Sequence, residues 1–567
     1  MASSPIFVLL PLLLVLPFLA SLSFAGADIA STSLVSTGTI CMSTPYPSIC
    51  RSNLPSNDTG DIYYFGRSSV RKSLSQASKF LALVDKYLAR QASLTIPAVR
   101  ALEDCRFLAS LNLDFLLSSF QAINATSSAL SVLKADDVQT VLSAVLTNQI
   151  TCLDGLQSTA SAWSVKSGLS VPLANDTKLS SVSLALFTRG WVPKKKKGNG
   201  GTGVRQPKSR QLPFQNGRMS FTMSSRTRGI YESVTRRTLL QSSGDDSVLV
   251  SDMVVVSQDG TGNFTTINDA VAVAPNNTDG KSGYFLIYVT ADVYEEYVSI
   301  AKNKKYLMMI GDGINQTVIT GNRNVVDGWT MFNSSTFAVV APNFVAVNMT
   351  FRNTAGPAKH QAVAVRSGAD LSMFYSCSFE AYQDTLYTHS LRQFYRECDI
   401  YGTVDFIFGN AAVVFQNCNL YPRLPMSGQS NMITAQGRTD VNQNTGTSIH
   451  NCIIKAANDL ASSNTSVQTY LGRPWKQYSR TVYMQSFMDS LINPAGWQIW
   501  DGDFALSTLY YAEYNNTGPG SNTTNRVTWP GYHMINATDA VNFTVSSFLL
   551  GDDWLPQTGV PYMSGLI

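Results

Sequence analysis

Two aspartates stand in apolar surroundings, where a carboxylate is expensive to bury unless it is paired or hydrogen-bonded. Asp405 lies in GTVDFIFGN (402–410), whose other side chains are typical of a buried strand. Asp384 lies 21 residues earlier, in AYQDTLYTHS. The structural alternative for Asp405 is a strand-end aspartate that points outward or caps a turn. Other features of the chain must show whether Asp405 has this structural role or a catalytic one.

Neighbouring turns of a repetitive fold would bring Asp384 and Asp405 within a few ångströms of each other. Two such carboxylates cannot both ionise easily, so one pKa should rise and leave a proton available at mildly acidic pH. An ionised and a protonated carboxylate together form a nucleophile and an acid. Gln383, and Gln361 in HQAVAV about one turn earlier, could hold an oxyanion through their amide N–H groups.

The segment LGRPW (471–475) adds two further candidates. Arg473 could grip an ionised Asp405, and Trp475 could stack on the face of a sugar ring. Each residue alone is weak evidence, since Trp475 could belong to the core. The set as a whole is stronger evidence for chemistry than any of its members.

Residues 245–567 contain many short β-rich runs separated by Gly, Asn and Asp. Similar strand–turn units recur about every 20–25 residues, and Cys377, Cys398 and Cys418 are spaced 21 and 20 apart. This period predicts a mainly β fold, a right-handed parallel β-helix in which residues one turn apart lie side by side. A large β-sandwich is the alternative, although it would prefer tighter antiparallel hairpins.

Residues 32–187 have the composition of a helical domain. Segments such as VRKSLSQASKFLALVDKYLA place apolar residues at helical spacing, and we expect about four helices. Cys41 and Cys50 flank a Pro-containing turn and are close enough to pair. Cys105 and Cys152 would then tie two helices together.

Residues 188–244 read as a basic linker without apolar periodicity. Residues 1–244 carry 25 Lys/Arg against 12 Asp/Glu, whereas residues 245–567 carry 17 against 26. Most of the positive excess of residues 1–244 lies in this linker. A nucleic-acid-binding arm is one interpretation of its KKKK motif. In a secreted chain a protease site fits better, and RRTLLQSS (236–243) is the expected region of cleavage.

The N-terminus indicates secretion. Residues 1–25 contain an apolar stretch followed by small residues suited to signal cleavage, although a positive n-region is lacking. A membrane anchor is the alternative, but about 15 apolar residues with two prolines fall short of the ~20 that a span requires. Eight cysteines and many N-x-S/T sequons suit an oxidising compartment and glycosylation. The sequons include those at Asn57, Asn124, Asn175, Asn263, Asn315, Asn348 and Asn536.

The blocks QAVAV, YQDTLY, GTVDFIFGN and LGRPW, in this order and spacing, resemble the signature blocks of plant pectin methylesterases. The resemblance extends through GDGINQTVITGNRNVVDGW, MITAQGRTDVNQNTG and NPAGWQIWDGDFAL, so that it covers essentially all of 250–555. Residues 32–187 resemble the pectin methylesterase inhibitor domain, a four-helix bundle. The chain looks like the group in which an inhibitor-like pro-region precedes the enzyme.

The resemblance implies ester hydrolysis on pectin without metal or cofactor. Asp405 would attack the C6 carbonyl of a methyl-esterified galacturonate, and Gln361 and Gln383 would stabilise the oxyanion. Asp384 would protonate the departing methanol and then activate water. Arg473 would orient Asp405.

The resemblance also implies substrate contacts, with two departures from the usual pattern. Gln361, Arg473 and Trp475 would contact the sugar. Met331 stands where a substrate-contacting threonine is usual, which puts one subsite contact in question. Asp292 stands where glycine is usual, and it would strain a turn that required a positive φ.

The resemblance implies a processing step and a further disulfide. RRTLL at 236–240 matches the family's basic motif, so Arg236, Arg237 and Leu240 would mark the cut made by a subtilisin-like protease. The pro-domain would keep the enzyme silent until then. The family's catalytic-domain disulfide maps onto Cys398 and Cys418, leaving two buried thiols, Cys377 and Cys452.

The expected partners are pectin, the chain's own pro-domain or separate inhibitor proteins, and the protease. Nucleic acid, stable membrane association and oligomerisation are not expected, and the expected location is the plant cell wall. A pectate lyase would need a calcium-binding acidic cluster and a polygalacturonase its own set of aspartates around an NTD-type motif, and we find neither set of carboxylates. A serine esterase is disfavoured because the sequence contains no GxSxG. A non-catalytic wall protein would have lost Asp384 or Asp405, and both are present.

Overall fold

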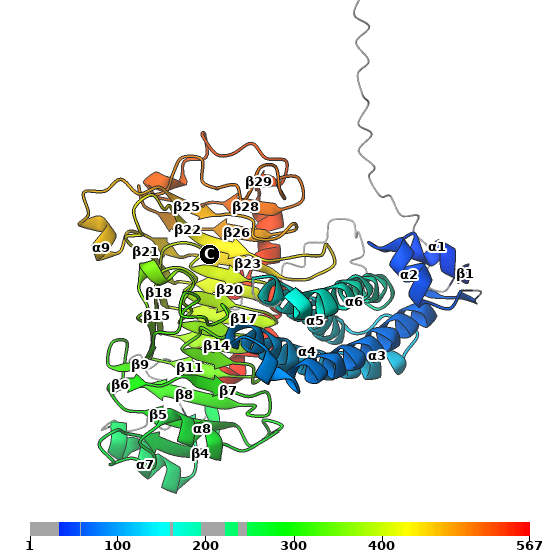
Figure 1. Ribbon diagram of the computed structural model, residues 1–567. Coiled ribbons are helices and arrows are strands. Elements are labelled where there is room, and N and C mark those ends of the chain that lie inside the picture. Colours follow the sequence, from blue (N-terminus) through cyan, green and yellow to red (C-terminus); the bar gives the residue numbers. More distant parts are fainter. Residues whose placement is uncertain (1–32, 57, 159–162, 194–220, 236–246) are drawn as a thin grey trace, which may run out of the picture.

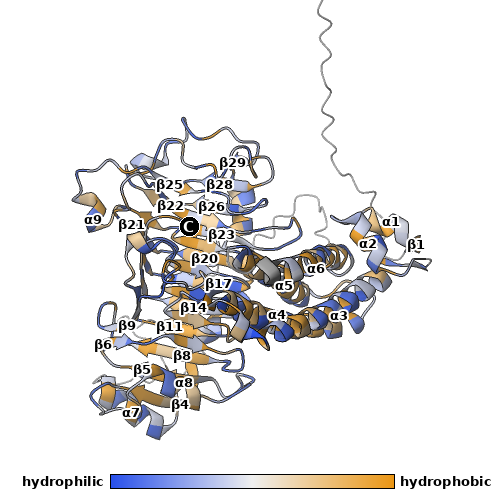
Figure 2. Ribbon diagram, in the orientation of Figure 1, coloured by the Kyte–Doolittle hydropathy of each residue, from blue (hydrophilic) through white to orange (hydrophobic). Residues whose placement is uncertain are grey.

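A computed structural model of the protein describes residues 33–56, 58–158, 163–193, 221–235 and 247–567. A bundle of long helices abuts the side of an elongated stack of β-strands, and the helices run across the stack (Figure 1). Apolar residues gather on the strands, whereas the helices carry both apolar and polar residues (Figure 2). The expected signal segment (1–25), the KKKK motif and the cleavage motif (236–240) lie outside the described residues.

Four long helices form the bundle, as the apolar spacing predicted. The aspartate side chain of Asp61 caps the first of them by accepting a hydrogen bond from the N–H of Tyr64 at 2.7 Å. A small antiparallel pair of strands and two short helices precede the bundle. The elements are β1 (Val35–Ser36), α1 (Thr37–Cys41), α2 (Pro47–Asn53), β2 (Thr59–Gly60), α3 (Ile62–Leu88), α4 (Ile96–Asn124), α5 (Val132–Ser158) and α6 (Trp163–Gly190).

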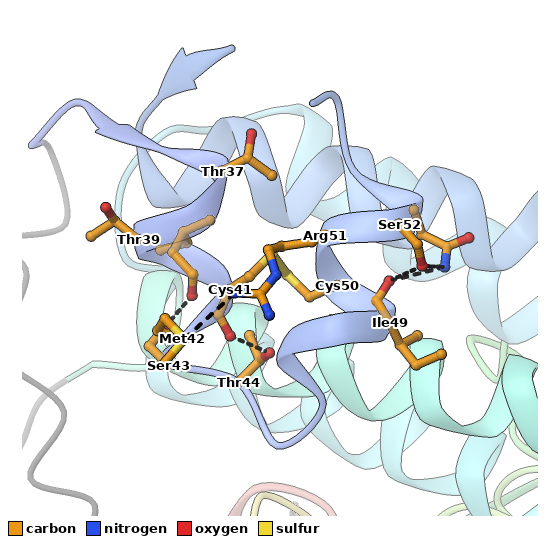
Figure 3. The surroundings of a disulfide bond; sticks show 12 residues. Thr37, Thr39, Cys41, Met42, Ser43, Thr44, Ile49, Cys50, Arg51 and Ser52 are labelled. Atoms are coloured by element: carbon orange, nitrogen blue, oxygen red, sulfur yellow. Dashed lines mark hydrogen bonds between the residues drawn. A yellow bond between two sulfur atoms is a disulfide. The ribbon is translucent and has the colours of Figure 1, made fainter. Parts of the chain in front are cut away.

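Two disulfides fix this domain in the expected pairs. Cys41 and Cys50 join α1 to α2, where Thr44 of the intervening turn donates to the Cys41 carbonyl (Figure 3). Cys105 and Cys152 join α4 to α5. The helical domain extends past residue 187, because Trp191 is fully buried against Tyr63 and Phe187.

The strands wind into a parallel β-helix of three sheets, whose strand pairs are all parallel. The seven-stranded sheet contains β7 (Val298–Ile300), β10 (Phe337–Val339), β13 (Val365–Ser367), β16 (Leu386–Thr388), β19 (Ile407–Gly409), β22 (Asn431–Gln436) and β25 (Thr469–Gly472). The eight-stranded sheet contains β6 (Asp292–Glu295), β9 (Thr317–Gly321), β12 (Thr350–Asn353), β15 (Ser378–Glu380), β18 (Asp399–Gly402), β21 (Asn419–Pro422), β24 (Ile453–Ile454) and β27 (Phe487–Met488). The twelve-stranded sheet contains β3 (Phe221–Thr222), β4 (Val248–Val256), β5 (Tyr284–Val289), β8 (Leu307–Gly311), β11 (Val345–Val347), β14 (Ser372–Tyr375), β17 (Arg392–Arg396), β20 (Ala412–Gln416), β23 (Gly446–His450), β26 (Arg480–Met484), β28 (Tyr510–Tyr514) and β29 (Tyr532–Met534).

The turns of the β-helix repeat one backbone device. The residue between a strand of the twelve-stranded sheet and the next strand adopts a left-handed conformation, for example Asn417 (φ 56) and Asn451 (φ 54). Asparagine is enriched at such positions because its short polar side chain tolerates positive φ. Asp292 has no positive φ and begins β6 in extended backbone, so the substitution for glycine causes no strain there.

A ladder of buried cysteines corrects the third predicted disulfide. Cys377, Cys398, Cys418 and Cys452 follow these left-handed residues in successive turns, and all four are free thiols. The Cys398 and Cys418 side chains donate instead to backbone carbonyl groups, those of Phe374 at 3.4 Å and Tyr395 at 3.5 Å. The expected Cys398–Cys418 bridge is therefore not formed, whereas Cys377 and Cys452 are buried thiols as expected.

Part of the expected linker is folded. β3 pairs in parallel with β4, and α7 (Ser225–Thr235) packs its apolar residues against the same sheet. Phe221 is 4% exposed, and Tyr231 meets Phe221 and Tyr288 at ring distances of 5.5 and 6.0 Å. The segment covers the first turn of the β-helix, which would otherwise present a strand edge to solvent. The sequence prediction of one linker over 188–244 is therefore wrong for residues 221–235.

In a fragment that lacks the helical bundle, this segment should still stabilise the β-helix. A fragment of residues 219–567 should exceed a fragment of residues 245–567 by about 2–4 kcal/mol in free energy of unfolding, because two aromatic side chains lose their burial in the shorter fragment. Thermal unfolding followed by circular dichroism compares them. The longer fragment carrying Phe221→Ala and Tyr231→Ala should behave like the shorter one. Equal midpoints for all three would show that the segment adds no stability.

The C-terminal segment covers the outer face of the twelve-stranded sheet, where Val545, Leu549 and Trp554 are buried against strand residues such as Val414. The remaining helices are short: α8 (Ile267–Val273), α9 (Asn458–Ala461), α10 (Ala537–Ala540) and α11 (Val545–Phe548). Within the described residues, no helix is both long enough and apolar enough to cross a membrane.

Candidate active site

Asp384 and Asp405 lie side by side at the start of two paired strands. β16 and β19 pair in parallel with Leu386 opposite Ile407, and the N–H of Asp384 donates to the carbonyl of Val404 at 3.1 Å. The 21-residue spacing thus equals one turn of the β-helix, as predicted. Both aspartates have left-handed backbone, with φ of 63 and 54. Such strained backbone is concentrated at functional sites in proteins, where the surrounding fold enforces it.

Arg473 holds Asp405 through a two-pronged ion pair. The guanidinium donates from Nε to Oδ1 at 2.8 Å and from Nη2 to Oδ2 at 2.7 Å. Arg473 follows β25, and its guanidinium also lies 4.4 Å from the ring centroid of Trp500. This bidentate geometry fixes both oxygens of the carboxylate and favours its ionised form.

The surroundings of the two carboxyl groups separate their protonation states. Burial, and secondly the charge of Asp405, raise the pKa of Asp384 well above its usual value. Burial also raises the pKa of Asp405, but the hydrogen bonds and charge of Arg473 oppose that rise. The proton of the pair therefore belongs on Asp384, and Asp405 is the ionised member.

Gln361 and Gln383 lie on neighbouring turns beside this pair. The N–H of Ala362 donates to the carbonyl of Gln383 at 3.2 Å, which sets the two segments next to each other. Gln383 directly precedes Asp384 in the chain, and both glutamine side chains are half-buried. The structure thus brings all five predicted residues of the reacting centre to one region of the β-helix.

Three aromatic side chains form a floor next to the carboxylates, which we call the aromatic floor: Tyr387, Phe408 and Trp475. Tyr387 stacks on Phe408 with ring centroids 4.3 Å apart, and Trp475 meets Phe408 edge-on at 6.0 Å. The Trp475 ring fits because position 437 is glycine: an added Cβ would come within 2.8 Å of it. Of these three residues, only Trp475 was predicted from the sequence. The repeat of the spacing Asp-x-x-aromatic at 384–387 and 405–408 could have revealed the other two.

The helical bundle covers this floor. One apolar cluster contains Tyr387 and Phe408 of the β-helix together with Leu102, Cys105 and Cys152 of the bundle. Met331 and Trp475 pack against its edge. Met331 and Trp475, two of the residues expected to contact a substrate, therefore pack against the same apolar cluster as the bundle.

Polar contacts surround the Cys105–Cys152 disulfide at this interface. Asp104, fully buried, accepts hydrogen bonds from Thr330 and Asn333 at 2.5 Å each, and burial raises its pKa to about 7. On the other side of the bridge, Thr151 lies 3.0 Å from Nε2 of His389. The disulfide thus fixes the helix segments that touch the β-helix.

A second polar region lies toward the other end of α5. Arg392 of β17 pairs with Asp136 and Asp137 of the bundle at 2.9 Å each, and with Asp370 of the β-helix at 2.7 Å. Asn410 donates to the hydroxyl of Thr147 at 2.9 Å. Buried, charge-assisted contacts of this kind fix one orientation of two domains.

Comparisons with known proteins agree with this division of the chain. The pectinesterase family model matches residues 253–552, and the model described as plant invertase/pectin methylesterase inhibitor matches residues 36–186. The two matched segments correspond to the β-helix and to the bundle.

Two relatives from Arabidopsis thaliana match over most of their length. "Probable pectinesterase/pectinesterase inhibitor 7" is 64% identical over 586 residues and is covered in full, as is this chain. "Probable pectinesterase/pectinesterase inhibitor 41" is 66% identical over 543 residues, 94% of this chain and 95% of that protein. Among solved structures, pectin methylesterase from carrot has a TM-score of 0.54 at 53% identity, covering 58% of this chain and 100% of that chain. The chain belongs to the pectinesterase family and carries, ahead of its pectinesterase domain, a domain of the plant invertase/pectin methylesterase inhibitor family.

Proposed function

We propose that this pectinesterase hydrolyses the methyl esters of homogalacturonan with Asp405 as its nucleophile. An oxygen of Asp405 attacks the C6 carbonyl carbon and forms an acyl-enzyme anhydride, and the methoxy group leaves as methanol with the proton of Asp384. Ionised Asp384 then takes a proton from water, which hydrolyses the anhydride and restores both carboxyl groups. The observation that carries the proposal is the bidentate Arg473–Asp405 pair beside the buried carboxyl group of Asp384, whose pKa burial and the charge of Asp405 raise. Methanol release from methyl-esterified homogalacturonan by residues 219–567 tests it.

The amides of Gln361 and Gln383 stabilise the oxyanion of the tetrahedral intermediate. The position of the two glutamines on neighbouring turns, beside the reacting pair, supports this role. An oxyanion donor is worth about 10²–10³ in kcat in other enzymes. Trp475, with the rest of the aromatic floor, binds the sugar chain, since aromatic faces suit sugar rings. Met331, which packs at the edge of the same cluster, borders a neighbouring subsite.

The pH dependence of the reaction follows from the two protonation states. Activity should rise as Asp405 loses its proton and fall at higher pH as Asp384 loses its own, and the raised pKa of Asp384 moves that fall away from the acidic range. Asp384→Asn should lower methanol release by about 10²–10⁴-fold and remove the high-pH fall from the remaining activity. Initial rates of the wild-type and Asp384→Asn fragments, measured across the pH range, check this prediction. A variant that keeps the wild-type profile would exclude Asp384 as the acid.

The bundle acts as an inhibitor in cis until the chain is cut. It covers the aromatic floor and is fixed there by the contacts of Asp104, Thr151 and Arg392. A subtilisin-like protease that cuts at the RRTLL motif, with Arg236, Arg237 and Leu240, releases it. The mature enzyme then acts as a secreted monomer in the plant cell wall, where separate inhibitor proteins can take the place of the bundle.

A further inference from the structure

An ion pair joins the bundle to the β-helix at the rim of the aromatic floor. The ammonium of Lys476 lies 2.8 and 3.0 Å from the two carboxylate oxygens of Asp154, which belongs to α5. The two side chains are 22% and 31% exposed. Lys476 directly follows Trp475, and its ammonium lies 5.1 Å from the centroid of that ring.

The carboxylate of Asp154 lies at the edge of the aromatic floor, because its partner, the ammonium of Lys476, lies 5.1 Å from the centroid of the Trp475 ring. Burial raises the pKa of the Tyr387 phenol, and the charge of Asp154 adds to that rise. Tyr387 and Phe408 each follow a reacting aspartate by three residues along a strand, which is about 10 Å. A few linked sugar rings cover that distance. The pair of Lys476 and Asp154 is therefore placed at a subsite next to the reacting ester.

The cations near the floor differ in what they already bind. Arg473 is committed to Asp405 on the β-helix itself, and Arg366 lies with its guanidinium 3.6 Å from the centroid of Phe332 and donates to a backbone carbonyl. Lys476, in contrast, pairs with a carboxylate of the bundle, which leaves when the bundle leaves. A released enzyme would then present an ammonium beside an aromatic ring.

A galacturonate unit carries a carboxylate at C6 once its ester has been hydrolysed, whereas a methyl-esterified unit is neutral. The Asp154 carboxylate is the same chemical group. We propose that Lys476 binds the carboxylate of an already de-esterified galacturonate unit next to the ester under attack, and that Asp154 takes this place in the uncut chain. This inference rests on the proposed reaction. It predicts faster attack on esters that have a free uronate as neighbour.

The test compares two substrates on the fragment of residues 219–567. The carrot enzyme covers a share of this chain close to that of its β-helix and folds without a bundle, so the fragment should do the same. kcat/KM for methanol release is measured on fully methyl-esterified and on half-de-esterified homogalacturonan. Lys476→Gln should lower the ratio of the second value to the first about fivefold, the strength of a partly exposed ion pair. Lys476→Arg should restore most of that ratio.

Lys302 supplies a matched control. It also pairs with a carboxylate of the bundle, that of Asp114, but it follows β7 and is not part of the aromatic floor. Lys302→Gln should leave the ratio unchanged. As a second measurement, unesterified trigalacturonate should inhibit the wild-type fragment more strongly than the Lys476→Gln fragment.

The outcomes separate the inference from the proposed reaction. An unchanged ratio in Lys476→Gln, or an equal loss on both substrates, would overturn the assignment of Lys476 while the wild-type fragment still releases methanol. A folded wild-type fragment that releases no methanol from either substrate would refute the proposed reaction, and the inference with it.

Discussion

Asp405→Asn should reduce methanol release by the catalytic fragment by about four orders of magnitude or more. The amide cannot form the anhydride, so the covalent route is closed, and losses of this size follow the removal of a nucleophile in other enzymes. The substitution nearly conserves shape and leaves one oxygen for Arg473. Methanol release from highly methyl-esterified homogalacturonan, with folding checked by circular dichroism, measures the effect.

Asp399→Asn is the control for this prediction. Asp399 also begins a strand of the β-helix and accepts a hydrogen bond from Asn419 at 2.8 Å, but it belongs to the eight-stranded sheet and not to the reacting pair. The Asp399→Asn fragment should release methanol within about twofold of the wild-type rate, because the half-buried side chain keeps an oxygen that can accept from Asn419. If Asp405→Asn retained a tenth of the wild-type rate, Asp405 could not be the nucleophile.

The uncut chain should release methanol at less than about one hundredth of the rate of residues 219–567. The bundle covers the aromatic floor, and its tether keeps its effective concentration high, so that even modest contacts hold it in place. The comparison needs equal molar amounts of both proteins and a check that the full chain remains uncut during the assay.

Charge reversal at the interface should open the site without any cleavage. Asp136→Lys together with Asp137→Lys turns two attractive contacts with Arg392 into repulsive ones, and the uncut double variant should regain at least a tenth of the fragment's activity. Asp85→Asn is the matched control, because Asp85 pairs with Arg106 inside the bundle. Full activity of the uncut wild-type chain would contradict inhibition in cis.

The repeat spacing allowed the sequence to predict the reacting pair. A parallel β-helix stacks equivalent residues of successive turns, so the 21 residues between Asp384 and Asp405 translate directly into side-by-side placement. The helical bundle was predictable for a similar reason, since apolar side chains at helical spacing need a common core. The first two disulfides followed from their positions in that bundle.

Other features depend on contacts that no local pattern encodes. Cys398 and Cys418 are neighbours in the ladder, yet their thiols bond to backbone carbonyls, and the sequence spacing is the same for either arrangement. Residues 221–235 look like linker, and they fold because β4 offers a strand edge and an apolar face. The docking of α4 and α5 on the aromatic floor joins residues more than 200 positions apart, such as Asp104 and Thr330.

Transfer of the galacturonyl acyl group from its methyl ester to Asp405 is the central step, and hydroxylamine tests it most directly. An acyl-enzyme anhydride should react with hydroxylamine as well as with water, so the fragment should convert part of the substrate to the C6 hydroxamate while it releases methanol. Asp405→Asn should form no more hydroxamate than hydroxylamine forms from the same ester without enzyme. Wild-type methanol release that yields only the free carboxylate at every hydroxylamine concentration would contradict the account, because water would then attack the ester without a covalent intermediate.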